Sequence, residues 1–280
     1  AHWLVHAPIH TKNKELLQYY SDKLGIDFPT KNIPIKTGGQ TNPFYGSMVT
    51  TLDWSLGRVV DLLKKTDDPR NPGKKLYETT YIIFSSDNGA VEKANGDIVT
   101  DNFPLDQGKK YAQEGGIRVP FLVKWPLKIK EPKTTDIPVT GLDIYPTLLD
   151  VVKQKQNTNL DGVSLLPYLT DNKKIEERSL FWHFPIYLQA VNPKKEQARD
   201  PLFRTRPGSV VRKGKWKLHE YFEDNALELY NLEIDIQEKN DVSSQNPEIV
   251  KELYQELKAW RNNTNAPVPT KLNQEYNPNK

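Results

Sequence analysis

The chain has 280 residues, of which 36% are apolar, 10% are aromatic and 27% are charged, with a formal net charge of +3. This content excludes intrinsic disorder, and the lack of any apolar run of about eighteen residues excludes a transmembrane helix within these residues. The small, evenly spread positive charge gives no indication of nucleic-acid binding, and the absence of cysteine excludes disulfides, thiolate metal sites and a cysteine nucleophile here.

The N-terminal part is predicted to form one strand and two helices. Trp3-Leu4-Val5 reads as a buried strand, which ends before Pro8 because a residue preceding proline disfavours the helical region. Helices are expected over 14–24 and 43–65, and the second has one apolar face. That face is formed by Met48, Leu52, Leu56, Val59, Leu62 and Leu63, which recur in steps of three and four.

The middle of the chain alternates strands and helices. Residues 79–84 (TTYIIF) predict a strand buried on both faces, and 119–124 predict a second strand. Residues 90–113 are polar and show no periodicity. A helix is expected over 140–153, followed by a loop and short helix over 161–169. This pattern indicates an α/β sheet, in which ligands bind beyond the carboxyl ends of strands.

The pattern changes near residue 178. Short strands are predicted over 181–184, 209–212, 215–221 and 228–231, and Gly214 makes a tight turn between the second and third. Strands joined by such turns favour an antiparallel sheet. An amphipathic helix follows over 247–261. We therefore expect an α/β domain over 1–175 and a small antiparallel subdomain with a C-terminal helix and tail over 176–280.

The most specific chemical signal follows the 79–84 strand. Asp87 and Asn88 are adjacent oxygen ligands of the kind that Ca²⁺ or Mg²⁺ prefers, and Lys109 supplies a charge for an anion. Gly115-Gly116 permits close approach of the backbone. The alternatives are that Asp-Asn-Gly is a simple turn, that Lys109 is a solvated surface charge, and that Arg118 is only an internal salt-bridge partner.

The order of motifs resembles the type I sulfatase family of the alkaline-phosphatase-like superfamily. The motifs are TTYIIFSSDNGA, a Gly-Lys pair, EGGIRVPFLVKWP, DIYPTLLD, DGVSLLP, VRKGKWKL and ELYNL, in that order. Each is weak alone, but together they run from His6 to about Asp241. The resemblance implies an alkaline-phosphatase-like sheet followed by the small antiparallel subdomain.

The resemblance also implies roles for single residues. Asp87 and Asn88 correspond to ligands of a divalent cation, Ca²⁺ ahead of Mg²⁺. Lys109 corresponds to a sulfate contact, and His6 of the VHAP segment to a substrate contact and candidate acid. His183 lies where family members often place loops near the pocket, so it is a further substrate-binding candidate. Its alternative role is packing within an aromatic cluster.

The sequence departs from the family in its nucleophile. Sulfatases use a formylglycine made within a C/S-x-P-x-R motif, and they complete the metal site with an Asp-Asp pair. The C/S-x-P-x-R motif does not occur here, and the family's N-terminal Asp-Asp pair is missing, since both normally precede the strand at which this chain begins. We therefore expect the C-terminal portion of a sulfatase, inactive by itself, with the missing N-terminal half or another chain as partner.

Three functions remain open at this point. The first is a sulfuric-ester hydrolase, with a sulfated carbohydrate as the expected substrate. The second is a phosphate- or phosphonate-ester hydrolase, although phosphatases of the superfamily tend to have Asp-His where Asp87-Asn88 stands. The third is a non-catalytic protein that binds sulfated glycans. An extracytoplasmic location, periplasmic or secreted, follows from family analogy alone.

Overall fold

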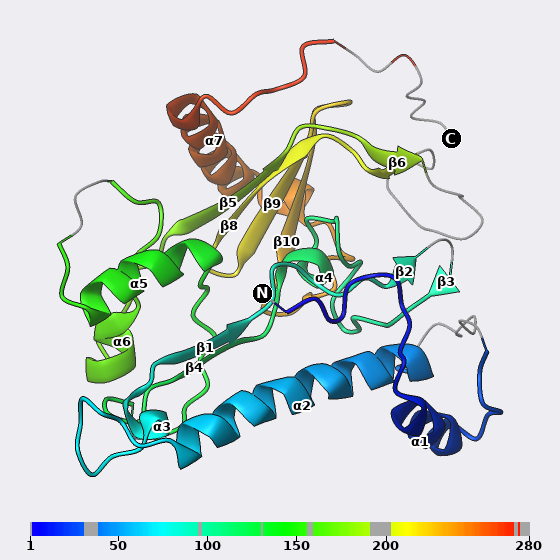
Figure 1. Ribbon diagram of the computed structural model, residues 1–280. Coiled ribbons are helices and arrows are strands. Elements are labelled where there is room, and N and C mark those ends of the chain that lie inside the picture. Colours follow the sequence, from blue (N-terminus) through cyan, green and yellow to red (C-terminus); the bar gives the residue numbers. More distant parts are fainter. Residues whose placement is uncertain are drawn as a thin grey trace. The chain divides into compact units, whose positions relative to one another are not determined.

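The computed structural model describes residues 2–30, 39–94, 97–129, 131–155, 159–190, 203–271 and 274 (Figure 1). Its contacts divide the chain into two compact units. Unit 1 comprises Ala1–Trp54, Asn88–Val119 and Arg178–Lys280, and unit 2 comprises Ser55–Asp87 and Pro120–Glu177. Each unit is described separately below. The expected domains, 1–175 and 176–280, stay a prediction.

The main sheet of unit 1 is the predicted antiparallel one, with strand order β10-β9-β8-β5. Its strands are β5 (Ser179–Phe184), β8 (Gly208–Lys213), β9 (Trp216–Tyr221) and β10 (Ala226–Asn231). All neighbouring pairs are antiparallel. Gly214 turns the chain between β8 and β9 with a φ of 55°, a left-handed conformation that glycine adopts without steric penalty. The predicted subdomain sheet is thus confirmed.

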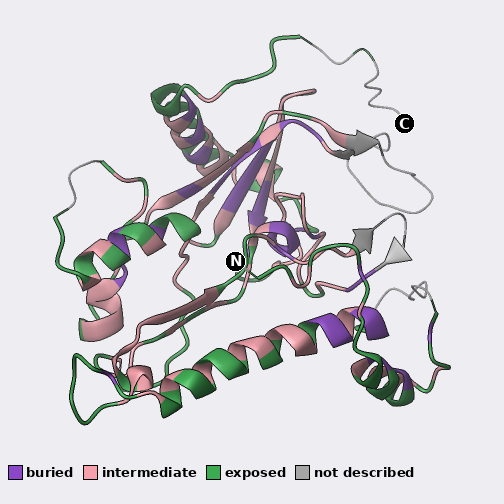
Figure 2. Cartoon of the chain, in the orientation of Figure 1, coloured by how far each residue is buried: buried purple, intermediate pink, exposed green. Residues whose placement is uncertain are grey.

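Helix α7 (Pro247–Thr264) packs on one face of this sheet. Leu253 and Leu257 of the helix are 2% and 0% exposed, so the centre of the predicted apolar face is buried. They form one core with Val211, Leu218 and Leu229 of three adjacent strands. Figure 2 shows the buried residues of α7 on the side of the helix that faces the sheet.

The two N-terminal helices have the predicted bounds, α1 (Lys14–Leu24) and α2 (Pro43–Lys65). Asn13 caps α1, since its Oδ1 accepts from the Leu16 backbone N–H at 3.0 Å. Asn42 serves α2 in the same way, with the Phe44 N–H as donor at 3.0 Å. A small core gathers Ile9, Leu17, Phe44, Met48 and Val99.

The prediction of a strand over Trp3–Val5 is wrong. The His6 N–H donates to the Trp3 carbonyl at 2.9 Å and closes a turn, and Trp3 is 89% exposed. A strand requires a neighbour in a hydrogen-bonded ladder, and no described strand pairs with this segment. The apolar side chains therefore do not by themselves create a strand here.

The predicted strand over 79–84 begins later than expected. In unit 2 the chain first forms a helical turn, α3 (Leu76–Thr79), because the Glu78 carboxylate accepts from the Lys75 N–H at 2.7 Å. Strand β1 (Ile82–Ser85) then pairs antiparallel with β4 (Phe121–Lys124), its one neighbour among the described residues. Ile82 to Phe84 are therefore half-buried, and the expectation of burial on both faces is wrong.

The remaining helices of unit 2 agree with the predicted segments. They are η1 (Gly141–Asp143), α5 (Ile144–Val151) and α6 (Leu166–Asp171). Asp143 joins them, since its carboxylate accepts from the Thr140 N–H at 2.8 Å and from the Val163 N–H at 2.9 Å.

The short elements of unit 1 lie mainly in its loops. They are β2 (Lys93–Ala94), β3 (Asp97–Ile98), α4 (Glu114–Ile117), β6 (Leu188–Ala190), β7 (Phe203–Thr205) and η2 (Ser243–Gln245). None of the helices described in either unit is long and apolar enough to cross a membrane.

Candidate functional site

Asp87 and Asn88 follow β1, in the predicted bend. Asp87 is exposed and Asn88 is half-buried. The boundary between the two compact units falls between them, so Asp87 belongs to unit 2 and Asn88 to unit 1. The exposed Asp87 carboxylate is accessible to a ligand from solvent.

Lys109 lies beside the segment that follows Asn88. Its backbone N–H donates to the Ala90 carbonyl at 2.9 Å, which holds the two segments together within unit 1. Two residues near Lys109 adopt positive φ although they carry side chains: Gln107 at 58° and Lys110 at 89°. Such conformations are unfavourable and tend to occur at functional sites. The backbone on both sides of Lys109 is thus held in a locally unfavourable conformation.

Glycines allow the backbones around Lys109 to touch. The Gly89 N–H donates to the Gly116 carbonyl at 2.8 Å. A Cβ atom at Gly89 would lie 1.8 Å from the Gly115 oxygen, and one at Gly115 would lie 2.0 Å from the Gln107 oxygen. No side chain fits at such distances, so the predicted close approach at Gly115-Gly116 is confirmed.

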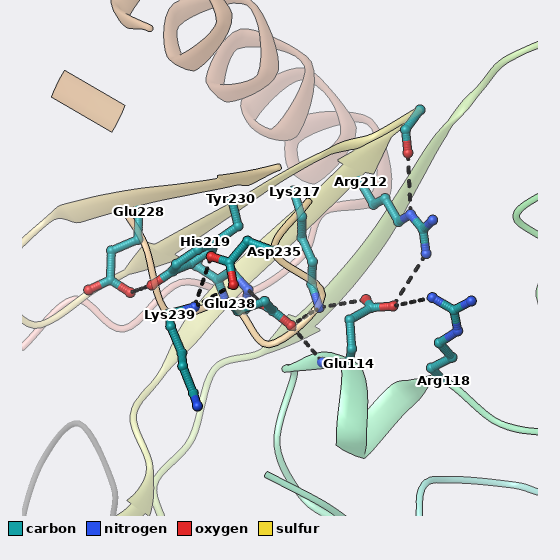
Figure 3. A network of polar contacts seen from close by, with 11 residues as sticks. Glu114, Arg118, Arg212, Lys217, His219, Glu228, Tyr230, Asp235, Glu238 and Lys239 are labelled. Carbon is teal, nitrogen blue, oxygen red and sulfur yellow. Dashed lines mark hydrogen bonds and ion pairs between the residues drawn. The ribbon is translucent and has the colours of Figure 1, made fainter. Parts of the chain in front are cut away.

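Glu114, just before these glycines, is buried in an ion-pair network (Figure 3). Its Oε1 accepts from Lys217 Nζ of β9 at 2.9 Å, and both side chains are at most 1% exposed. Its Oε2 lies 3.4 Å from Arg212 Nη1 of β8 and 3.7 Å from Arg118 Nη1. Arg118 is therefore a salt-bridge partner of Glu114, which agrees with the alternative that it serves as an internal salt-bridge partner.

Glu238 is the second buried carboxylate of the network. Its Oε1 accepts from Lys217 Nζ at 2.9 Å and from the Glu114 backbone N–H at 2.6 Å. Its Oε2 accepts from His219 Nε2 at 2.6 Å. Burial alone would raise the pKa of Glu238, but the hydrogen bond and charge of His219 and the charge of Lys217 outweigh it and lower the pKa to about 2.

The neighbouring titratable groups shift in the directions that burial dictates. Burial lowers the pKa of His219, and the hydrogen bond to Glu238 opposes this only in part. Burial raises the pKa of Asp106, the backbone hydrogen bond of Gln107 opposes the rise, and the charge of Glu238 adds to it. Glu238 is thus within electrostatic range of the loop that carries Lys109.

Lys217, His219 and Glu238 were not predicted from the sequence as site residues. One signal was present: β9 places Lys217 and His219 on one side of the strand and apolar Leu218 on the other, and all three are buried. Leu218 contributes to the core with α7, so the polar side faces α4 and Glu238. A strand with charges at alternate positions is ordinarily interpreted as half-solvated.

His6 is exposed and lies in the irregular N-terminal segment. Its Nδ1 lies 2.9 Å from the Ala7 carbonyl oxygen. Because a carbonyl only accepts, this contact suits a ring that carries a proton on Nδ1. Val5, which precedes His6, and Val91, which lies three residues after Asn88, both pack against the small N-terminal core of unit 1. The structure thus brings the chain around His6 and the chain after Asn88 to one cluster.

His183 lies on β5 with protein partners at both ring nitrogens. Nδ1 is 2.7 Å from Ser209 Oγ, and Nε2 is 2.7 Å from the Pro267 carbonyl. The ring also packs near Phe222 and Trp260, with centroid distances of 5.9 and 6.2 Å. These contacts agree with the aromatic-cluster alternative, and a substrate contact by His183 stays a prediction.

A pocket of about 90 Å³ lies within unit 1, between the 107–113 loop and the sheet. Lys110, Tyr111, Trp182, Arg206 and Tyr221 are among its lining residues, and so is His183. Lys109 is not, although Lys110 is adjacent in the chain. The predicted sulfate contact is therefore not part of this pocket.

Asp87 and Asn88 fit part of a metal site. A carboxylate and an amide oxygen are the ligands that Ca²⁺ accepts, but Ca²⁺ takes six to eight oxygen atoms. Within the described ranges no three His, Cys, Asp or Glu side chains gather as a metal-binding group. The pair could thus supply only a minority of the ligands of such an ion.

Comparison with known proteins gives a consistent family assignment. The sulfatase family model matches residues 8–154, and a model described as N-sulphoglucosamine sulphohydrolase, C-terminal, matches residues 106–263. A protein named sulfatase from Formosa agariphila is 30% identical over 245 residues, which are 81% of this chain and 41% of that protein.

Two further relatives have a sugar in their name or title. An N-acetylgalactosamine-6-O-sulfatase from Bacteroides thetaiotaomicron is 29% identical over 227 residues, 76% of this chain and 41% of that protein. The crystal structure of Ps i-CgsB in complex with k-i-k-neocarrahexaose is 29% identical with a TM-score of 0.66, and the match covers 92% of this chain and 48% of that one.

The chain spans less than half the length of these relatives. The predicted α/β fold of alkaline-phosphatase-like type is confirmed, because the structural matches to Ps i-CgsB and to the putative sulfatase yidJ from Bacteroides fragilis cover 92% and 93% of this chain. The two family models together extend from the N-terminal core to α7. The chain belongs to the sulfatase family.

Proposed function

We propose that the protein to which this chain belongs hydrolyses sulfuric esters, with a sulfated carbohydrate as substrate. The observation that carries the proposal is the backbone hydrogen bond between Lys109 and Ala90, which holds the lysine beside the segment following Asp87-Asn88. A cation suited to the anionic ester therefore lies on a segment that is hydrogen-bonded to the one following the proposed metal ligands. The sugar-specific names of two relatives support the substrate class.

The roles of the chain's own residues follow from their chemistry. Lys109 offers an ammonium group to a sulfate oxygen, and a positioned cation stabilises charge that develops there. When both ring nitrogens of His6 are protonated, Nε2 can deliver its proton to the leaving oxygen, and the neutral ring that remains keeps the Nδ1 proton on the Ala7 carbonyl. We propose both as the residues of this chain that contact the reacting group.

Asp87 and Asn88 would hold the metal ion, Ca²⁺ ahead of Mg²⁺. A divalent cation bound there would neutralise the charge of the sulfate ester. The nucleophile that the family resemblance implies, a formylglycine, would come from sequence outside these 280 residues, as would the remaining metal ligands. We therefore propose that the isolated chain is inactive.

The partner that we propose is the N-terminal half of the family fold. Unit 2 exposes a row of apolar side chains along η1 and α5, with Leu142, Tyr145 and Val152 each 59% to 61% exposed. Apolar rows of this kind mark surfaces that another part of a protein covers. An extracytoplasmic location is proposed from family analogy, and cell fractionation with an antibody to this chain tests it.

The test of function uses the full product of the gene that encodes this chain. Rates are measured on matched aryl sulfate and aryl phosphate esters, and then on sulfated oligosaccharides. Faster hydrolysis of the sulfate supports the proposal. Faster hydrolysis of the phosphate would establish the phosphatase alternative, and calcium-dependent glycan binding without any turnover would establish the binding alternative.

Lys109 has a matched control in its neighbour Lys110. We expect Lys109→Met to lower kcat/KM on the aryl sulfate by about 10²- to 10³-fold, the effect of losing one positioned charge donor. Lys110→Met removes the same charge one residue away and is expected to change kcat/KM by less than about tenfold. Equal losses in the two variants would contradict the role of Lys109.

The metal is tested by removal and return. A chelator should abolish activity, and added Ca²⁺ should restore it in the wild type but much less in Asp87→Ala. A chelated protein that keeps full activity would contradict the metal site. Calcium binding measured by calorimetry gives the same test without turnover.

A further inference from the structure

Four buried polar groups connect α4 to the face of the sheet opposite α7. Glu114, Lys217, His219 and Glu238, here called the buried cluster, are between 0% and 7% exposed (Figure 3). Removing charges from water is unfavourable, and replacing a buried ion pair by apolar residues is often neutral or stabilising. The cluster is therefore poorly explained by stability alone, and its location suggests another role.

The buried cluster reaches Lys109 through backbone contacts. Glu238 Oε1 accepts from the Glu114 N–H at 2.6 Å, which fixes the first residue of α4. The next residue, Gly115, donates its N–H to the Asp106 carbonyl at 2.9 Å, at the start of the Lys109 loop. The path from the sheet to the loop thus consists of two consecutive backbone amides.

The same path continues to the segment after Asn88. The Gly116 carbonyl accepts from the Gly89 N–H at 2.8 Å, and the Ala90 carbonyl accepts from the Lys109 N–H at 2.9 Å. The backbones are in direct contact at these glycines, since a Cβ at Gly89 would lie 1.8 Å from the Gly115 oxygen. No free space remains between them in which α4 could move by itself. A displacement of α4 therefore displaces both segments.

The backbone of Glu238 is itself held in an unfavourable conformation. Its φ is 51°, although it carries a side chain. Asp235 closes the turn: its carbonyl accepts from the Glu238 N–H at 3.2 Å, and its carboxylate accepts from the Lys239 N–H at 3.0 Å. Strain of this kind persists where the surroundings determine the position of a side chain.

We propose that Lys217, Glu238 and His219 are positioning residues that set the placement of the Gly89 segment and the Lys109 loop from the C-terminal sheet. Their effect on catalysis rests on the proposed function, whereas their effect on the two backbone segments does not. The C-terminal subdomain thereby determines the geometry of a site whose reacting groups it does not itself supply.

The first experiment measures hydrogen exchange by mass spectrometry on the 280-residue chain. Lys217→Met removes the central cation of the buried cluster and keeps the length of the side chain. The matched control is Lys213→Met, because Lys213 Nζ also binds two carboxylates, Glu252 at 2.8 Å and Glu256 at 2.6 Å, both on α7. The control thus removes a lysine that also pairs with two carboxylates, but on the other face of the same sheet.

We expect Lys217→Met to accelerate exchange by about tenfold or more in peptides covering 86–92 and 106–118, and to change α7 peptides much less. Lys213→Met should leave 86–92 and 106–118 unchanged. Unaltered exchange in Lys217→Met, or equal acceleration in both variants, would overturn the proposal. Glu238→Gln is the second variant, since it keeps the shape and should give the same pattern if Lys217→Met does not fold.

The second experiment measures kcat and KM for an aryl sulfate with the full gene product. A shift of about 1 Å in a catalytic group can cost up to 10²-fold, so we expect Glu238→Gln to lower kcat by about tenfold with little change in KM. Lys213→Met should leave both constants unchanged. Normal kcat in a variant with accelerated exchange overturns the positioning role, whereas an inactive wild type overturns the proposed function alone.

Discussion

Helices α7 and α5 are both amphipathic by sequence, yet only α7 is covered on its apolar side. Leu253 and Leu257 of α7 are buried against the four-stranded sheet, at 2% and 0% exposed. Along η1 and α5, Leu142 and Tyr145 are 61% and 59% exposed, although Thr147 on another side of α5 is buried. An apolar helix surface of this kind is ordinarily covered by protein.

The difference extends to the sheets in the two units. The four-stranded sheet has α7 on one face and the buried cluster on the other, so its core residues Val211, Leu218 and Leu229 are fully buried. The two-stranded β1–β4 ladder of unit 2 leaves its apolar residues half-buried, and Leu122 is 58% exposed (Figure 2). The C-terminal sheet therefore carries its own core, whereas β1–β4 and α5 leave apolar side chains exposed.

The largest expected effect compares two leucines on the two helices. Leu257→Ala should lower the free energy of unfolding by about 2–5 kcal/mol, because it leaves a cavity in a closed core. Leu148→Ala, at a site 38% exposed on α5, should change it by less than about 1 kcal/mol. Urea denaturation followed by circular dichroism measures both, and equal losses would remove the distinction between the helices.

Acid should destabilise the C-terminal sheet through Glu238. The pKa of Glu238 is about 2 in the fold against an ordinary 4.5, so its contribution is complete above about pH 4.5 and disappears as the pH falls toward 2. The shift corresponds to about 3 kcal/mol. His219 acts in the same direction, because its lowered pKa means that the folded state resists protonation as the pH falls below 6.5.

The measurement is the free energy of unfolding between about pH 7 and pH 3. Glu238→Gln should be less stable than the wild type near neutral pH and should show a flatter dependence on acid. The control is Glu233→Gln in the same region, where the side chain is 68% exposed and pairs with Lys215 at 3.6 Å. If the free energy of unfolding depended on pH in the same way in the wild type and in Glu238→Gln, the lowered pKa of Glu238 would be refuted.

Local opening should follow the same division. Amides at the centre of β9, such as that of Leu218, are expected to exchange about 10²-fold more slowly than those of β1. The reason is that β9 has two strand neighbours and a closed core, whereas a two-stranded ladder is marginally stable alone. Native-state hydrogen exchange by NMR tests this, and similar rates would show that unit 2 is equally well covered.

The smallest effect on stability is expected on the exposed row. Leu142→Lys combined with Tyr145→Lys should change the free energy of unfolding by less than about 0.5 kcal/mol per site. Because exposed apolar surface favours association between copies, we expect the isolated chain to self-associate through this row. The double substitution should reduce that association, as measured by light scattering. Ile234→Lys, at an isolated apolar residue of unit 1 that is 83% exposed, is the control and should leave association unchanged.

Features set by local sequence were predictable. The bounds of α1 and α2 agree with prediction because periodic apolar residues and the caps at Asn13 and Asn42 lie within each segment. The strand over Trp3–Val5 was wrong because a strand is defined by partners, which no local pattern specifies. The boundary of β1 was shifted for a similar reason, since Glu78 stabilises a helical turn that the β-branched run conceals.

The site divides along the same line. The close backbone approach at Gly115-Gly116 could be predicted, because two adjacent glycines carry the signal, whereas the role of Lys109 stays a prediction. The buried cluster could not, because Lys217 and Glu114 are 103 residues apart and a lysine in a strand is ordinarily solvated. Only the fold shows that this lysine is fully buried between two carboxylates.

The hydrogen bond from His183 to the Pro267 carbonyl has a practical meaning for shortening the chain. The acceptor lies three residues beyond the end of α7, in a stretch without regular structure. Deleting the residues after Thr264 would remove the Pro267 carbonyl, and His183 Nε2 would then have to form its hydrogen bond with water. A stop codon after residue 271 would keep it, so the C-terminal limit for a minimal version lies between these two positions.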